Sequence, residues 1–197
     1  MANEADDGDG SQPLQYVILD CNIVHYWISK KMRQAITPVL AELEEANLRF
    51  AVSEISIYEA QCQLPRTKHV ESLELLEELP KFPVDTNVHL VTGTIMSCYR
   101  DHGKTKQHAD NISLQDGFNA ATAILNNAVL LTADFNDYPR PFFDEVWHWD
   151  VQGEKGQAQK IYLLKPDTDH LAQHSDKWFK ATRKQQPVTN PKSDTRK

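Results

Sequence analysis

The chain has 197 residues, of which 40% are hydrophobic and 25% are charged, and its formal net charge is −7. This composition is typical of a soluble globular domain, and the length is sufficient to bury a core without disulfides or a structural metal. The three cysteines share no Cys-x-x-Cys spacing, so the sequence indicates neither a disulfide framework nor a zinc site. No apolar run approaches the roughly 20 residues that a membrane-spanning helix needs, and we expect a cytoplasmic protein with no membrane segment.

The two ends of the chain differ in charge. Residues 1–13 contain four acidic residues but neither a basic start nor an apolar segment, which excludes a signal peptide and predicts disorder. Residues 167–197 are expected to form a short helix and then a basic, flexible tail. This tail is either a solvated end or a weak RNA-binding segment that contacts phosphates through Lys177, Lys180, Arg183 and Lys184.

Short apolar runs alternate with helical patterns along the middle of the chain. Three runs are typical of strands buried on both faces of a parallel sheet, namely Tyr16–Leu19, Leu48–Ser53 and Ala128–Thr132. Four helices are expected between them: one capped by Thr37 with Pro38 in its first turn, Glu71–Leu79, one from about Asp85 to Gly103, and Ser113–Asn127.

This alternation predicts a doubly wound α/β domain over residues 14–166, in which the functional motifs lie within 15–140. Later in the chain, Val146–Val151 and Lys160–Leu164 flank a polar segment that contains glycine. That pattern predicts a hairpin or a pair of edge strands over residues 145–166.

Four acidic residues stand at the ends of predicted strands or the starts of predicted helices: Asp20, Glu59, Asp116 and Asp134. Because the strand ends of an α/β sheet converge on one crevice, these distant carboxylates can share a site. A carboxylate cluster without matching cations is suited to hold a hard divalent cation such as Mg²⁺ or Mn²⁺. Asn22 and Thr132 lie two positions from an acidic residue, so strand alternation predicts that they face the same way and support the ligands.

Each acidic residue also has a purely structural interpretation. Ser56–Glu59 and Ser113–Asp116 both fit a helix capping box. Asp20 is compatible with a turn, and Asp134 with an Asx-turn. The absence of a G-x-S-x-G, a P-loop or a G-x-G-x-x-G disfavours nucleophilic hydrolases, ATPases and dinucleotide-binding enzymes.

Four stretches match, in order, the signature motifs of one family. They are Leu19–Asn22 for the opening D-x-N, Ser53–Glu59 for S-x-I-T-x-x-E, Asp116–Ala123 for D-x-x-I-A-A-T-A, and Thr132–Tyr138 for T-x-D/N-x-x-D-F. Within the third stretch, Asn119 replaces the usual aliphatic residue. Over residues 15–140 the chain thus resembles PIN domains, particularly the VapC-type toxin ribonucleases of bacterial toxin–antitoxin pairs.

The resemblance implies a PIN-like three-layer α/β fold, with a central, mainly parallel, twisted sheet flanked by helices and, in this chain, a C-terminal hairpin or edge-strand extension. It further implies a Mg²⁺- or Mn²⁺-dependent endoribonuclease that leaves a 5′-phosphate and a 3′-hydroxyl. The acidic set would be Asp20, Glu59, Asp116 and Asp134, with Asp137 as a rival to Asp134 for the fourth place. RNA, an antitoxin protein and a second copy of the chain are the partners that the resemblance implies.

Three other interpretations stay open on the sequence alone. A PIN ribonuclease can act in RNA processing or defence outside a toxin–antitoxin pair. A PIN scaffold can bind without cutting. A signalling receiver domain would use Leu131–Ala133 and Tyr162–Pro166 as its switch segments, but no acidic pair follows the first strand.

Overall fold

The computed structural model describes residues 15–63, 69–101, 113–138, 140–153 and 156–173. The expected disorder of residues 1–13, the helix end at Gly103 and the RNA-binding tail with Lys177, Lys180, Arg183 and Lys184 lie outside these described residues. The short helix expected after residue 167 is present in its described part, residues 168–173.

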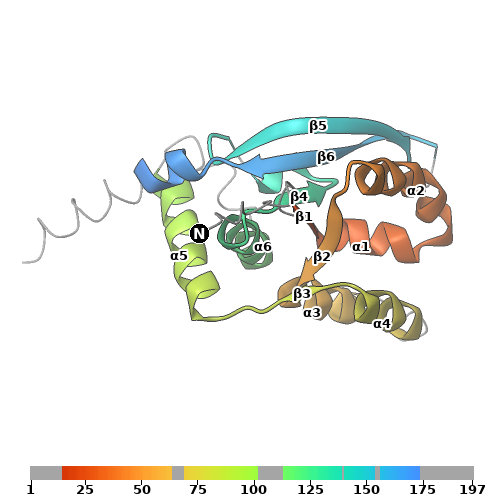
Figure 1. Ribbon diagram of the computed structural model, residues 1–197, viewed down its shortest axis with the longest axis horizontal. Coiled ribbons are helices and arrows are strands. Elements are labelled where there is room, and N and C mark those ends of the chain that lie inside the picture. The colour runs from red at the N-terminus through yellow and green to blue at the C-terminus, as the bar shows by residue number, and fades with distance from the viewer. Residues whose placement is uncertain (1–14, 64–68, 102–112, 139, 154–155, 174–197) are drawn as a thin grey trace, which may run out of the picture.

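Six strands form the central sheet, in the order β3-β2-β1-β4-β6-β5 (Figure 1). Four of them run parallel: β1 (Tyr16–Leu19), β2 (Arg49–Ser53), β3 (Lys81–Phe82) and β4 (Val129–Thr132). The remaining two, β5 (Phe143–Gln152) and β6 (Ala158–Pro166), form a hairpin, and β6 pairs antiparallel with β4. The predicted α/β fold with a C-terminal hairpin is therefore confirmed.

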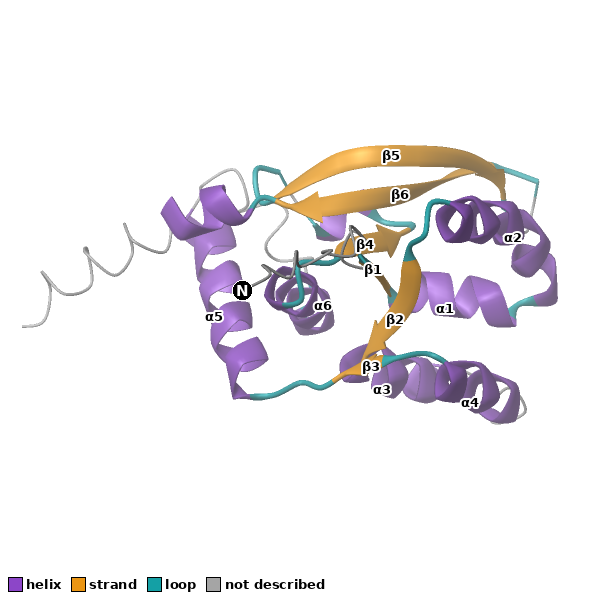
Figure 2. Ribbon diagram, in the orientation of Figure 1, coloured by secondary structure: helices purple, strands orange, loops and turns teal. Residues whose placement is uncertain are grey.

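Helices cover both faces of the sheet (Figure 2). On one face lie α1 (Cys21–Ile28), α2 (Lys30–Glu45) and α4 (His69–Glu78), and on the other lie α5 (Thr86–Asp101) and α6 (Leu114–Leu125). A further helix, α3 (Glu54–Gln63), follows β2 directly, and the 3-10 helix η2 (Phe135–Asp137) follows β4. In the described part of the chain, no helix is both long and apolar enough to cross a membrane.

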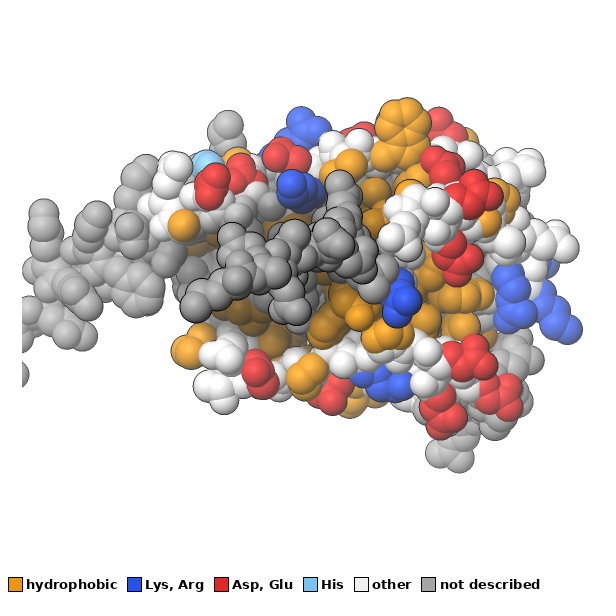
Figure 3. Space-filling model, viewed as in Figure 1, with side chains coloured by type: hydrophobic (Ala, Val, Ile, Leu, Met, Phe, Trp, Pro, Cys, Tyr) orange, Lys and Arg blue, Asp and Glu red, His pale blue; other side chains and the backbone are white. Residues whose placement is uncertain are grey.

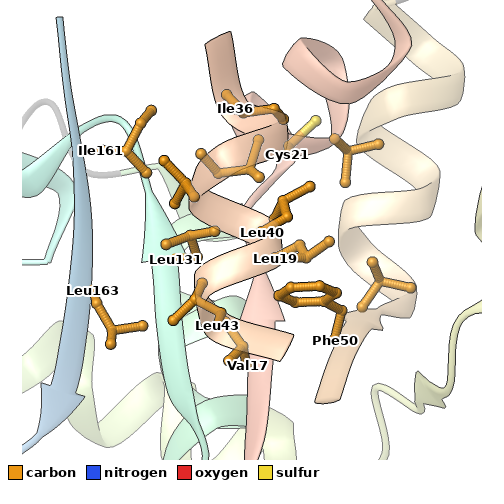
Figure 4. Close-up of a cluster of buried hydrophobic side chains, with 14 of the residues drawn as sticks. Val17, Leu19, Cys21, Ile36, Leu40, Leu43, Phe50, Leu131, Ile161 and Leu163 are labelled. Carbon is orange, nitrogen blue, oxygen red and sulfur yellow. The ribbon is translucent and has the colours of Figure 1, made fainter. Parts of the chain in front are cut away.

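The central strands are apolar on both faces, as the sequence predicted. Side chains of β1 alternate between the two layers, so Val17 and Leu19 enter the core beneath α2, whereas Ile18 enters the core beneath α6. Figure 4 shows the first of these cores, in which Leu40 and Leu43 of α2 lie over the strands. Burial on both faces fixes the sheet register, and with it the level at which each parallel strand ends.

The helix predicted to begin at Thr37 instead begins at Lys30, so the predicted cap is wrong. Pro38 lies inside α2, and the Thr37 hydroxyl donates to the carbonyl of Arg33 at 2.7 Å. The buried face of α2, which includes Met32 and Ile36 before the proline, outweighs the backbone hydrogen bond that Pro38 cannot make. Helix α1 was not predicted from the sequence. Its buried residues are Cys21, Ile23, Val24 and Ile28.

The capping box expected at Ser56–Glu59 is also wrong, because α3 begins at Glu54. The amide of Ser56 donates to the hydroxyl of Ser53 at 3.3 Å. Ser53 therefore satisfies a free amide of the first turn, and Ser56 turns its own hydroxyl into the core. Glu59 is the sixth residue of α3, so it lies beyond the first turn, in which a capping box forms.

Candidate active site

Asp20 follows β1 and caps helix α1, where it is only 3% exposed. Its Oδ1 accepts hydrogen bonds from the amide of Cys21 at 2.7 Å and from Nδ2 of Asn119 at 3.2 Å. Its Oδ2 accepts from Nδ2 of Asn22 at 2.8 Å and from the hydroxyl of Thr132 at 2.7 Å. Four donors therefore compensate for the cost of burying this carboxylate at the carboxyl end of the sheet.

Asn22 and Thr132 both contact Asp20, but the argument from strand alternation is wrong for Asn22. Asn22 lies in the first turn of α1 and reaches Asp20 from there. Its Oδ1 accepts from the amide of Ala133 at 3.0 Å, and its Nδ2 also donates to Thr132 at 3.1 Å. This side chain therefore connects the start of α1 to the end of β4. In the sheet, β4 is the neighbour of β1, the strand that leads into α1.

Asn119, on helix α6, is a site residue that the sequence did not identify. It is fully buried, and besides donating to Asp20 it accepts at Oδ1 from the hydroxyls of Ser53 at 2.5 Å and Ser56 at 3.0 Å. The available signal was the departure from the family motif, in which this position is aliphatic. A polar side chain among alanines on the buried face of a helix needs polar partners.

Asp116 caps its own helix, as one of the structural interpretations predicted. Its Oδ2 accepts from the amide of Ser113 at 2.8 Å and from the Ser113 hydroxyl at 2.7 Å. The Asp116 amide donates back to that hydroxyl at 3.2 Å, which completes the capping box. Among the described residues these bonds engage Oδ2 and leave Oδ1 available to a ligand.

The loop after β4 supplies two more carboxylates. Asp134 caps η2 by accepting from the amide of Asn136 at 3.0 Å, so the predicted Asx-turn is confirmed. Asp134 is exposed, whereas Asp137 at the end of η2 is half-buried. Both carboxylates are therefore candidates for the fourth acidic position.

The pKa values show that the acidic residues gather in one region. Burial, opposed by hydrogen bonds from Ser113 and supported by the charges of Asp20 and Glu59, raises the pKa of Asp116 to about 6. Burial also raises the pKa of Asp20, although its hydrogen bonds oppose the change. The pKa of Asp137 rises to about 7, because of burial first and then the charges of Asp116, Asp134, Asp20 and Glu59. Each of the five predicted acidic residues therefore lies within electrostatic range of others.

A divalent cation fits the chemistry of this donor set. The ligands are carboxylate oxygens, which Mg²⁺ and Mn²⁺ prefer. A cation would stabilise the ionised form of these buried carboxylates and reduce the repulsion between them. In the described part of the chain, however, no three His, Cys, Asp or Glu side chains are arranged to hold a metal as they stand. Three of the carboxylates, those of Asp20, Asp116 and Asp134, cap helices, and that of Asp20 accepts four hydrogen bonds. Ligation therefore requires these side chains to adjust.

A family model described as the PIN domain matches residues 17–140. The chain belongs to the PIN domain family. The matched region ends before β5, so the β5–β6 hairpin lies beyond it. Family membership and the antiparallel hairpin remove the support for the receiver-like interpretation.

Two solved structures similar to this PIN domain are toxin–antitoxin complexes. One is VapBC2 from Rickettsia felis bound to a DNA fragment from its promoter, with 21% identity and a TM-score of 0.49 over 64% of this chain and 94% of that one. The other is a toxin–antitoxin complex from Klebsiella pneumoniae, with 15% identity and a TM-score of 0.44 over 64% of this chain and 92% of that one. No curated protein matches the chain.

The raised pKa values predict how stability depends on pH. Asp137 and Asp116 bind protons more tightly in the folded chain, with pKa values of about 7 and about 6, than in the unfolded chain, where the value is near 3.8. Between about pH 4 and pH 7 the folded state therefore holds more protons, and the contribution of these groups to stability falls as the pH rises.

We expect Asp137→Asn to lose less stability than the wild type between pH 5 and pH 8, as measured by the midpoint of thermal unfolding. Asp144→Asn, at an exposed position on β5, is the matched control and should follow the wild type. A variant at Asp137 with the same pH dependence as the wild type would contradict the raised pKa.

Proposed function

We propose that this PIN domain is a Mg²⁺- or Mn²⁺-dependent endoribonuclease. The observation that carries the proposal is the convergence of Asp20, Glu59, Asp116, Asp134 and Asp137, whose charges interact where the parallel strands end. So many carboxylates without matching cations reduce stability near neutral pH. Such an arrangement suits a site whose ligand is itself positively charged.

The chain's own residues have distinct tasks in this proposal. Asp20 and Asp116 are the first metal ligands, and Glu59, with Asp134 or Asp137, completes the set or orients the attacking water. Asn22 and Thr132 hold the Asp20 carboxylate in one orientation through hydrogen bonds of 2.8 and 2.7 Å. When bound, the cation supplies an activated water and neutralises the charge that builds on the phosphate.

RNA as the substrate rests on the likeness of the four motifs to those of VapC-type ribonucleases. In-line attack by water at phosphorus requires no 2′-hydroxyl nucleophile. The bond from phosphorus to the 3′-oxygen breaks as the water oxygen bonds to phosphorus, and the 3′-oxygen leaves with a proton. The expected products therefore carry a 5′-phosphate and a 3′-hydroxyl.

Purified wild type should cleave RNA with Mg²⁺ or Mn²⁺ and lose the activity in EDTA. Asp116→Asn should reduce cleavage more than about 100-fold, because the amide lacks the negative charge that the proposed metal needs. This variant retains the shape of the side chain and an oxygen that can accept from Ser113, so it should stay folded. Asp144→Asn serves as the control and should cleave like the wild type. Equal cleavage by wild type and Asp116→Asn would show that the acidic cluster is not the active site.

We further propose that the nuclease acts as the toxin of a toxin–antitoxin pair, on the basis of the same motifs. A partner could bind in a groove of about 380 Å³ between the α1–α2 turn and α4, which is lined by Trp27, Lys30, Arg33, Glu74, Leu75 and Glu78. The groove combines apolar walls with charges of both signs, and acidic side chains gather over α4 (Figure 3). These features suit a protein segment better than a nucleic acid, whose phosphates the glutamates would repel.

Expression in a bacterial host distinguishes a toxin from a PIN ribonuclease of another setting. A toxin should arrest growth, and Asp116→Asn should restore growth at the same protein level. Growth unaffected by a wild type that cleaves RNA in vitro would contradict the toxin role and favour RNA processing. A wild type without nuclease activity would favour a non-catalytic PIN scaffold.

A further inference from the structure

Asn119 occupies the position at which the family motif carries an aliphatic residue, and it forms a buried polar cluster with Ser53 and Ser56. All three side chains are completely buried. Burying three polar groups in place of an apolar contact is costly unless each is hydrogen-bonded, and here each one is. At this place in the core, hydrogen bonds with a defined direction therefore take the place of apolar packing.

Chemistry fixes the orientation of the Asn119 amide. An ionised carboxylate only accepts hydrogen bonds, so the amide nitrogen must face Asp20, where Nδ2 lies 3.2 Å from Oδ1. The amide oxygen then faces the hydroxyls of Ser53 and Ser56, and both donate to it. With two hydroxyl donors on one side of the amide and the carboxylate acceptor on the other, only one of its two flipped orientations satisfies all three hydrogen bonds.

The cluster also connects the elements that carry the acidic residues. Ser56 lies on α3 one turn before Glu59, and Asn119 lies on α6 one turn after Asp116. Asp20, the third partner, connects β1 to α1. Thus one buried side chain of α6 contacts Asp20 directly and α3 through Ser56. These elements carry three carboxylates that come from separate parts of the sequence.

We propose that Asn119 is a positioning residue for the divalent cation. Its amide holds Oδ1 of Asp20, and its bonds to the two serines hold α3 and α6 at the separation that the acidic set requires. The inference rests on the proposed metal-dependent function and assigns a role to a residue outside the acidic set. Partners that orient a metal ligand typically change metal affinity 10- to 100-fold when they are removed.

Two variants separate positioning from simple stability. Asn119→Leu keeps the number and branching of the side-chain heavy atoms and has the apolar character of the family motif. It removes the amide oxygen that accepts from the hydroxyls of Ser53 and Ser56. The triple variant Ser53→Ala/Ser56→Ala/Asn119→Leu removes those hydroxyls as well. It should therefore regain part of the stability that Asn119→Leu loses, although it lacks the Ser53 hydroxyl that accepts from the Ser56 amide at the start of α3. In both variants Asp20 lacks the amide donor.

The experiment measures Mn²⁺ affinity by calorimetric titration of each full-length protein, together with the thermal unfolding midpoint without metal. We expect both variants to bind Mn²⁺ about 10- to 100-fold more weakly than the wild type, although the triple variant unfolds at a higher temperature than Asn119→Leu. Wild-type affinity in the triple variant would overturn the inference and leave the proposed nuclease intact. A wild type that binds no Mn²⁺ would overturn the proposed metal dependence itself.

Discussion

The architecture of the site depends on one buried charge, the carboxylate of Asp20 at the end of β1. Water does not solvate this group, so its ionised form persists only while protein donors surround it. Those donors come from α1, α6 and the end of β4. The hydrogen bonds that stabilise the charge therefore also fix the positions of these elements relative to β1, and the parallel strands place all of them at the same edge.

The neighbouring carboxylates create the opposite problem. Asp116 and Asp137 resist ionisation because burial and the charges around them raise their pKa values. Carboxylates in such surroundings reduce stability near neutral pH, so their presence together is consistent with a ligand that compensates for the repulsion. Helix capping by Asp116 keeps one of its oxygens engaged and pre-orients the side chain, so capping and ligation are compatible functions of one residue.

Local patterns in the sequence predicted the local parts of the structure. The strands followed from continuous apolar runs, and the cap at Ser113 followed from residues three positions apart. The proline at 38 misled the prediction of α2, because tertiary burial of the helix outweighed a local signal. Asn119 could not be assigned a role from sequence alone, since its partners Ser53 and Asp20 are 66 and 99 positions away. Contacts of that range depend on the sheet order, and no local pattern in the sequence encodes it.

The central claim is that the acidic edge beside Asp20 holds a divalent cation. A crystal structure of the full-length wild type grown with Mn²⁺, analysed by the anomalous scattering of manganese, tests it most directly. The account predicts a manganese peak within coordination distance of the Asp20 and Asp116 carboxylates. Manganese found only at surface carboxylates, such as those of Glu74 and Glu78 on α4, would contradict it.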